Sequence, residues 1–392
     1  MNVARRLPLV VIVAVLVAVG CGTVCAAASA GAGTKSSRAA RITAIVERSV
    51  VVPSQVNGVV YGVWQRGRRI VTGALGNAQA GVAARRGMHV RIGNTAESML
   101  ATVLLRFVDQ GKLSLSDRLS KWYPNLPNAN KVTLRMLADS TTGYNDFVTT
   151  DEFNTLLHAD PFRQFRVPEV IAIAMSKPPL FEPGTNWAFS DTNFLLLGQV
   201  LQKVGRKPIE VLQREQVFEP AGLTRTAATR STAIPPPVLH AYTSERGPYE
   251  ESTYWTTSWI PGVVDVTSTA GDMGKWARAL GRGTLLSEKT HAIRLAPNTA
   301  GLGPMTRRMY YTFGTAVSKR WVVNNPQVLG YTGIVAYNLR RDLSVAIFTT
   351  QGPQGDIAEA YATAIYEPLA RYLTPRDVPP LSALPRGKSG NR

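Results

Sequence analysis

The chain has 392 residues, of which 45% are hydrophobic and 18% are charged. This length and composition suffice for one large or two ordinary folded domains, and they exclude a disordered chain, a collagen-like repeat and a coiled coil. Lysine and arginine outnumber aspartate and glutamate by 44 to 26, which gives a formal net charge of +18. The basic residues are scattered and form no recognisable nucleic-acid-binding motif, so we expect no nucleic-acid partner. The charge suits an anionic cell envelope, or serves solubility alone.

Residues 1–30 have the pattern of an export signal. Arg5 and Arg6 precede an apolar run over residues 7–20, and the small residues that follow allow cleavage near Ala28 or Ala30. The run of about fourteen residues is short for a bilayer core of ~30 Å, so a short membrane anchor is only the alternative interpretation.

A lipid anchor is a second interpretation of the same segment. Residues 18–21, Ala-Val-Gly-Cys, resemble a bacterial lipobox with Cys21 as the candidate lipidation site, although leucine is more usual at its first position. Either signal predicts an exported protein of the cell envelope or the extracellular space, with membrane attachment only through a lipid. Because both cysteines lie within the first 25 residues, we expect no disulfide framework and no cysteine-bound metal in the body of the protein.

The remaining chain divides into a linker over residues 31–40, a domain over 41–373 and a flexible tail over 374–392. Residues 95–110 have apolar positions at helical spacing and end before Gly111, which predicts an amphipathic helix. The other predicted elements are, in chain order, a helix over 42–46, a hairpin of strands 59–64 and 69–72 across 65–68, a helical and loop-rich stretch over 113–280, strands over 311–317, 320–323, 334–339 and 343–349, and a helix over 357–373.

Strands at both ends with helices between them predict an α/β fold. We expect an antiparallel sheet built from both termini with flanking helices, plus an inserted, mainly helical lobe. The α/β lobe is assigned to residues 41–112 and 300–373, and the helical lobe to residues 113–299.

Several short motifs occur in an order that resembles one known family. They are, in chain order, His-Val-Arg-Ile-Gly at 89–93, Gly-Lys-Leu-Ser-Leu-Ser-Asp at 111–117, Thr-Thr-Gly at 141–143, Pro-Gly-Thr-Asn-Trp at 183–187, Phe-Ser-Asp at 189–191, Ser-Thr-Ala-Gly-Asp-Met at 268–273 and Tyr-Thr-Gly at 331–333. Over about residues 42–373 the chain is similar to the penicillin-recognising superfamily of serine β-lactamases and D-alanyl-D-alanine carboxypeptidases, nearest to the class C type.

That resemblance implies four kinds of catalytic or binding group. A serine at a helix N-terminus attacks an acyl carbonyl, a lysine three residues later helps to take its proton, a Tyr-x-Asn motif supplies a base and a substrate amide, and a Lys/His-Thr-Gly strand lines the opposite side. The matching positions here hold other residues. They are Asn94 and Glu97 in the first motif, Phe189 and Asp191 in the second, and Tyr331, Thr332 and Gly333 in the third.

The substitutions predict that acylation chemistry has been lost. An amide is no nucleophile, and a phenyl ring has no proton to exchange. A shifted alignment does not restore the motif, because no serine, threonine or cysteine lies three residues before any of the eleven lysines. Neither a Gly-x-Ser-x-Gly elbow nor a His-Glu-x-x-His zinc motif occurs in the chain. We therefore expect no catalytic residue, no metal and no cofactor.

Two hypotheses concern the substituted positions. Asn94 and Glu97 fit a capping box, in which Asn94 is the N-cap and Glu97 the third helical residue, and this would stabilise the helix by about 1 kcal/mol. Glu97 and Asp191 would also lie close together, so that one carboxyl has a raised pKa. We expect either an arginine between these two residues or a preference for cationic ligands. Phe189, Trp187 and Tyr331 would form an aromatic wall or pack between the lobes.

Three functions follow from these considerations. The first is an inactive homologue that binds a peptidoglycan fragment, an envelope peptide or a partner protein in a vestigial cleft. The alternatives are an active peptidase, esterase or β-lactamase that uses another nucleophile, Thr95 or Ser98, and a structural envelope protein whose cleft is filled by its own side chains.

Overall fold

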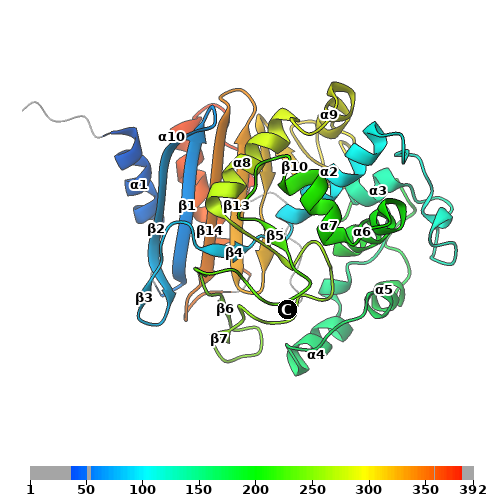
Figure 1. The fold of residues 1–392 in the computed structure, drawn as a ribbon, viewed down its shortest axis with the longest axis horizontal. Helices are drawn as coiled ribbons and strands as arrows, with labels where there is room; N and C mark the ends of the chain where they lie inside the picture. Colours follow the sequence, from blue (N-terminus) through cyan, green and yellow to red (C-terminus); the bar gives the residue numbers. More distant parts are fainter. Residues whose placement is uncertain (1–36, 51–53, 357, 382–392) are drawn as a thin grey trace, which may run out of the picture. The chain divides into compact units, whose positions relative to one another are not determined.

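The computed structural model describes residues 37–50, 54–356 and 358–381, and the chain order of its elements is seen in Figure 1. The helices are α1 (Arg38–Ser49), α2 (Thr95–Asp109), α3 (Leu134–Asp139), α4 (Asp151–Ala159), α5 (Val167–Met175), α6 (Asp191–Gly205), α7 (Ile209–Gln213), α8 (Ala270–Arg282), α9 (Glu288–Leu295) and α10 (Tyr361–Leu373), with 3-10 turns η1 (Leu119–Lys121) and η2 (Phe147–Thr149) and a π-helical turn η3 (Arg214–Phe218). The strands are β1 (Val56–Gln65), β2 (Arg68–Gln79), β3 (Val82–Ala83), β4 (His89–Arg91), β5 (Ala227–Ala228), β6 (Tyr242–Thr243), β7 (Glu250–Glu251), β8 (Val266–Thr269), β9 (Met309–Thr312), β10 (Thr315–Ser318), β11 (Trp321–Asn324), β12 (Gln327–Val328), β13 (Tyr331–Asn338) and β14 (Leu343–Gln351).

The main sheet contains strands from both ends of the described chain. Its order is β3-β2-β1-β14-β13-β11-β10-β9, with β12 paired to β13, and all of these pairs are antiparallel. The N-terminal β1 and the C-terminal β14 are neighbours in the centre of the sheet. This confirms the predicted α/β fold with an antiparallel sheet built from both termini.

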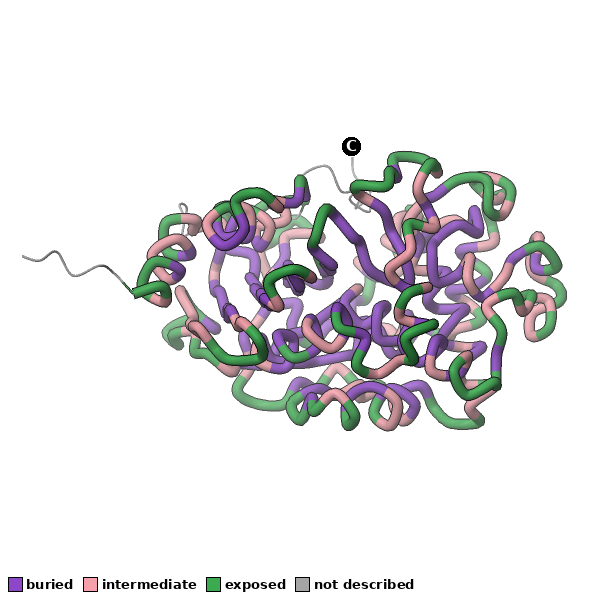
Figure 2. The backbone as a smooth tube through the Cα atoms, turned by 90° about the horizontal axis from the view of Figure 1, so that it is seen from above, coloured by how far each residue is buried: buried purple, intermediate pink, exposed green. Residues whose placement is uncertain are grey.

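Helices cover both faces of this sheet. On one face α1 and α10 bury Ile42, Ile365 and Leu369 against Val59 and Val63 of β1. On the other face α8 packs against β1, β13 and β14. Because both faces are covered, β13 and β14 are buried along their whole length, without alternation of buried and exposed residues. Buried backbone, drawn purple in Figure 2, runs through the interior of the domain.

Helix α2 is the central helix of the part of the domain that lies beside the main sheet. The sequence predicted an amphipathic helix, but Thr95 to Leu105 are buried on every side, because α6, α7, α9 and the β9–β10 hairpin surround it. Any charged side chain in its first turns is therefore removed from water. This burial decides the chemistry of Glu97, which is 1% exposed.

Several predicted boundaries differ from the structure. The hairpin after β1 turns through Arg66 and Gly67 alone, both with positive φ, which is the two-residue turn that suits a twisted ribbon. The predicted strand over 311–317 is two strands, β9 and β10, because Phe313 and Gly314 with positive φ form a turn between them. Within the predicted helical lobe, α8 covers the sheet, whereas α2 of the predicted α/β lobe packs among the helices.

The ordered domain is longer at both ends than the predicted range of 41–373. Helix α1 begins at Arg38, and its N-cap Ser37 accepts a hydrogen bond from the backbone N–H of Ala40. After α10, Thr374 accepts a hydrogen bond from Trp321, and Leu381 is buried in the α1–α10 core. The predicted export signal, Cys21 and most of the linker lie outside the described residues. Within the described part, no helix combines the length and the apolar character that crossing a membrane requires.

Candidate functional site

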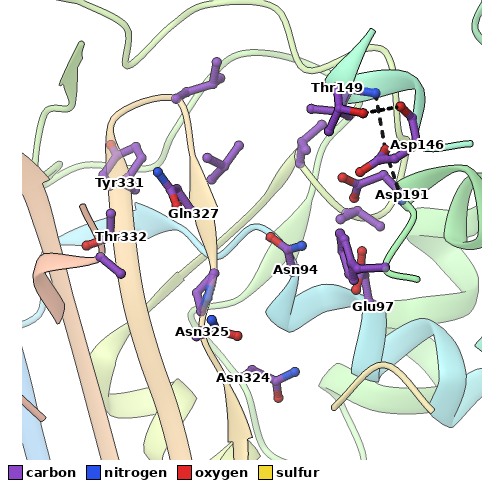
Figure 3. Close-up of a pocket in the computed structure, with 18 of the residues that line it drawn as sticks. Asn94, Glu97, Asp146, Thr149, Asp191, Asn324, Asn325, Gln327, Tyr331 and Thr332 are labelled. Atoms are coloured by element: carbon purple, nitrogen blue, oxygen red, sulfur yellow. Dashed lines mark hydrogen bonds between the residues drawn. The ribbon is translucent and has the colours of Figure 1, made fainter. Parts of the chain in front are cut away.

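A cavity of about 270 Å³ lies between the start of α2 and the strand segment 324–332. Figure 3 shows its two walls: Glu97, Asp146 and Asp191 form one, and Asn324, Asn325 and Gln327 form the other, with Asn94 between them. Six of the seven residues predicted for the vestigial cleft line this cavity. The exception is Gly333, whose Cβ position would clash with Phe348 at 2.8 Å and which therefore has a packing role in β13.

The predicted capping box is wrong. Asn94 has helical φ and ψ and makes no side-chain capping hydrogen bond, and the first three N–H groups of α2 donate to the backbone oxygens of residues 92, 93 and 94. These backbone bonds satisfy the donors that an N-cap side chain would otherwise accept. The half-buried amide of Asn94 thus lines the cavity, and Glu97 does not turn back to the helix N-terminus.

Glu97 belongs instead to a cluster of three carboxyl groups from separate parts of the chain. Its Oε2 atom accepts a hydrogen bond from the hydroxyl of Tyr311 at 3.2 Å, and its carboxyl group interacts electrostatically with that of Asp191. Asp146, which precedes η2, accepts hydrogen bonds at 3.3 Å from the backbone N–H groups of Val148 and Asp191. The predicted proximity of Glu97 and Asp191 is thus present, with Asp146 as an unpredicted third member.

Burial and mutual repulsion favour the protonated forms of these groups. Burial raises the pKa of Glu97 well above its usual value, and the charge of Asp191 raises it further. Burial also raises the pKa of Asp191 to about 6. The pKa of Asp146 is raised well above its usual value by burial and by the neighbouring Asp191. All three shifts act in the same direction, toward the protonated carboxyl groups.

No cation of the described chain offsets this cluster. The predicted arginine salt bridge between Glu97 and Asp191 is absent from the ion pairs of the described residues, and the alternative, a preference for cationic ligands, stays a prediction. The described cavity lining contains no lysine or arginine, and its acidic residues are Glu97, Asp146, Asp191, Glu245, Asp356 and Glu359. No three histidine, cysteine or acidic residues of the described ranges have the geometry of a metal site.

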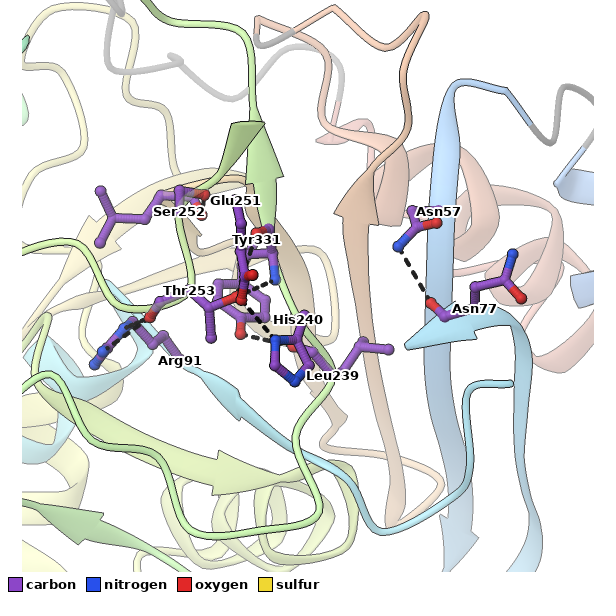
Figure 4. Close-up of polar contacts among 11 residues, drawn as sticks. Asn57, Asn77, Arg91, Leu239, His240, Glu251, Ser252, Thr253 and Tyr331 are labelled. Carbon is purple, nitrogen blue, oxygen red and sulfur yellow. Dashed lines mark hydrogen bonds and ion pairs between the residues drawn. The ribbon is translucent and has the colours of Figure 1, made fainter. Parts of the chain in front are cut away.

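The aromatic wall forms around Tyr311 and not around Tyr331. The Tyr311 ring lies 5.5 Å from that of Trp187 and 6.2 Å, edge to face, from that of Phe189. Tyr331 is buried, and its hydroxyl donates a hydrogen bond of 2.7 Å to the carbonyl of Leu239 (Figure 4). Trp187 and Phe189 thus pack against Tyr311, whereas Tyr331 lines the cavity with its hydroxyl bonded away from it, and the choice between an aromatic wall for a ligand and packing between the lobes stays a prediction.

The hydroxyl groups proposed as alternative nucleophiles lie away from the cavity. Ser98 is buried, donates to the carbonyl of Thr95 at 2.6 Å and accepts from the indole of Trp276 at 3.1 Å. Thr95 is also fully buried, and neither residue is part of the cavity lining. The described lining contains no serine, cysteine or lysine, and its single histidine, His158, interacts with Glu245 at 3.6 Å.

Sequence analysis missed three residues of this site, Asp146, Tyr311 and Asn324. Asp146 lies shortly after the Thr-Thr-Gly stretch at 141–143, which was the only local signal for its position. Tyr311 is the third residue of β9 and Asn324 is the last residue of β11, and both resemble ordinary strand residues. The side-chain Oδ1 atom of Asn324 has no hydrogen-bond donor among the described residues, and the residue is 5% exposed.

The fold is that of the β-lactamase and penicillin-binding-protein type of serine hydrolase. The chain belongs to the beta-lactamase family, whose model matches residues 43–367. It is 26% identical over 215 residues to a putative penicillin-binding protein, PbpX, of Bacillus subtilis, covering 54% of this chain and 52% of that protein. It is 30% identical over 192 residues to the D-alanyl-D-alanine-carboxypeptidase/endopeptidase AmpH of Escherichia coli, covering 48% and 47%.

Solved structures agree on the fold. A D-stereospecific amidohydrolase from Streptomyces has a TM-score of 0.73 at 24% identity and covers 84% of this chain and 97% of that one. A penicillin-binding protein from Bacillus halodurans has a TM-score of 0.71 at 20% identity, with 84% and 99% covered. The chain spans about half the length of the curated relatives named above, and at these identities the structural likeness concerns the fold alone.

Proposed function

We propose that this protein binds a peptide-type ligand of the cell envelope without forming a covalent bond to it. The observation that carries the proposal is the described cavity lining, which contains no serine, cysteine or lysine. It includes the amide of Asn94, the residue that the sequence resemblance matches to the family's nucleophile. Acyl transfer requires an activated hydroxyl or thiol beside a base. A cavity of this family whose described lining lacks serine, cysteine and lysine retains its capacity to bind ligands.

The open cavity favours binding over the structural alternative. A cleft that had only to stabilise the fold would be filled by apolar side chains, since packed interiors are more stable than empty polar ones. This cavity keeps about 270 Å³ of space and retains polar groups on both walls. The curated relatives include a D-alanyl-D-alanine-carboxypeptidase and an N-acetylmuramyl-L-alanine amidase, which supports a peptide-type ligand.

Covalent labelling tests the proposal directly. The protein is incubated with a fluorescent penicillin and, separately, with a fluorophosphonate probe, and labelled peptides are sought by mass spectrometry. We expect no adduct with either probe, while a muropeptide mixture raises the melting temperature, because a ligand that binds the native state stabilises it. An adduct on any hydroxyl group of the chain would establish the alternative, an active hydrolase with a non-standard nucleophile.

We further propose that the protein is exported by the signal in residues 1–30, with Cys21 as the lipid attachment site. The support is the sequence pattern alone. In bacterial cells that express the full chain, we expect metabolic labelling with an alkyne-tagged fatty acid, and loss of that label in the Cys21→Ala variant. Export of an unlabelled wild-type protein would instead support cleavage near Ala28 or Ala30.

A further inference from the structure

We propose that the carboxyl cluster of Glu97, Asp146 and Asp191 is a binding subsite for a ligand ammonium group, and that occupation of this subsite releases protons from the cluster. This inference rests on the proposed non-covalent binding function and names the chemical class of the ligand. The argument starts from charge. The chain as a whole has a net charge of +18, yet the described cavity lining has six acidic residues and no lysine or arginine.

Unsatisfied acceptor atoms give independent support. Glu97 is 1% exposed, and its Oε1 atom accepts no hydrogen bond from the described residues. On the opposite wall the Oδ1 atom of Asn324 also lacks a donor, because the side-chain amide of this residue is oriented to donate to the carbonyl of Gly314 at 2.7 Å. Buried acceptors without donors are unfavourable. An ammonium group offers three N–H donors and no acceptor, so it satisfies a buried acceptor of this kind where a carboxylate ligand would not.

The aromatic wall suits the same ligand class. The rings of Trp187, Phe189 and Tyr311 line the cavity beside the carboxyl cluster. A cation near aromatic faces is attracted by their quadrupoles, and the carbon chain that carries it is covered by apolar surface. The cavity volume of about 270 Å³ is close to the lower limit for small-molecule sites, which favours a ligand group about the size of one or two amino acid residues.

Binding of a cation changes the protonation of the cluster. The groups that face one another are Glu97 from α2, Asp191 from α6, Asp146 before η2 and the Tyr311 hydroxyl from β9. The charge of Asp139 from α3 contributes to the raised pKa of Tyr311, and Asp139 is paired with Arg135 at 3.5 Å. An entering ammonium stabilises the ionised carboxylates, so protons held by the empty cluster pass to the solvent. The charge gained by the site is thereby balanced by protons lost to the buffer.

Isothermal titration calorimetry of the full chain tests this inference with a matched pair of probes. The cationic probe is 2-phenylethylammonium, and the neutral probe is its N-acetyl derivative. At pH 7.0 we expect the cation to bind at least tenfold more tightly, with an enthalpy that differs between phosphate and Tris buffers because protons are released. Glu97→Gln and Asp191→Asn should each weaken cation binding at least fivefold and reduce the proton release. Glu47→Gln, a matched change on the exposed face of α1, should match the wild type.

Several results would overturn the inference. Equal or tighter binding of the neutral probe, absence of binding by either probe, or unchanged affinity in both Glu97→Gln and Asp191→Asn would each exclude the ammonium subsite. Circular dichroism spectra and melting temperatures show whether the variants are folded. Failure here is distinguishable from failure of the proposed function: a penicillin adduct refutes non-covalent binding, whereas a muropeptide that stabilises the protein without any ammonium preference refutes the subsite alone.

Discussion

At the scale of single residues, Glu97 shows how burial changes the role of a helix N-terminal acid. On an exposed helix, a glutamate at the third position hydrogen-bonds the N-cap backbone and interacts with the helix dipole. Here the first turns of α2 are buried, and the nearest polar partners of Glu97 are Tyr311 and Asp191. The side chain therefore contributes to a shared carboxyl site and not to capping.

The absence of a side-chain cap at α2 leads to a first prediction. Asn94→Ala should change the free energy of unfolding by less than about 0.5 kcal/mol, since no capping hydrogen bond is lost. Thr150→Ala is the matched control, because the Thr150 side chain accepts the Phe153 N–H at 3.2 Å as the N-cap of α4. It should cost about 1 kcal/mol. Urea denaturation measures both, and a loss at Asn94 as large as that at Thr150 would restore the capping interpretation.

The raised carboxyl pKa values predict that the ligand-free protein loses stability as the pH rises. The pKa of Glu97 is higher in the folded than in the unfolded chain. The contribution of protonated Glu97 to the free energy of unfolding is therefore complete below about pH 4, and it is lost as the pH rises through the folded pKa. Glu97→Gln should make the decline between pH 5 and 8 shallower, by at most about 1.4 kcal/mol per pH unit. Thermal or urea unfolding across this pH range measures the slope.

Glu47→Gln is again the control for this prediction. Glu47 is exposed on α1, and the change removes the same charge without touching the cavity. It should leave the pH dependence between pH 5 and 8 as it is in the wild type. If the free energy of unfolding of Glu97→Gln had the same pH dependence as that of the wild type, Glu97 would be ionised in the ligand-free cavity. The protons of the cluster would then be held by Asp146 or Asp191.

At the scale of elements, the β9–β10 hairpin positions the aromatic wall. Its turn is tied to α3, where Phe313 N–H donates to Asp139 at 2.9 Å and Gly314 N–H donates to the carbonyl of Ala138 at 3.0 Å. The same turn lies against the backbone of α2. The hairpin thus brings Tyr311 to Glu97, although 214 residues separate them in the sequence.

Gly314 is the residue on which this arrangement depends. It has a φ of +73°, and a Cβ atom there would lie 2.7 Å from the Glu97 carbonyl carbon and the Ser98 nitrogen. Gly314→Ala should therefore cost about 2 kcal/mol more than Gly222→Ala, which has a similar φ of +65° but no neighbouring atom within 4 Å. Chemical denaturation compares the two variants. Equal losses would show that backbone strain alone, and not the contact with α2, requires glycine.

At the scale of the whole molecule, the sheet is formed by the two ends of the domain. Residues after α10 also pack against the sheet face that α1 and α10 cover. Leu381 is 4% exposed and packs in the core formed by α1, α10 and the sheet. Trp321 of β11 donates a hydrogen bond of 3.2 Å to Thr374. The segment that the sequence assigned to a flexible tail is thus part of the hydrophobic core as far as residue 381.

This packing predicts that the C-terminal segment contributes to global stability. Leu381→Ala should reduce the free energy of unfolding by about 2–3 kcal/mol, as for other buried leucines. Leu180→Ala provides the comparison, because Leu180 is 57% exposed and its loss should cost less than about 0.5 kcal/mol. Equilibrium urea denaturation gives both values, and a Leu381→Ala variant as stable as Leu180→Ala would mean that the segment is dispensable for folding.

The sequence by itself determined the family, the fold class and the absence of the Ser-x-x-Lys motif. These features are local: strand and helix periodicity, short motifs, and the identity of residues at fixed spacing can all be judged without knowing what lies nearby in space. Only the tertiary structure decided which groups meet. Asp146, Tyr311 and Asn324 reach the site from distant segments, and the choice between capping and a carboxyl cluster for Glu97 depended on burial of α2 by the helices and strands around it. Solvation and long-range proximity set the protonation and partners of a carboxyl group, and neither is encoded in its immediate neighbours along the chain.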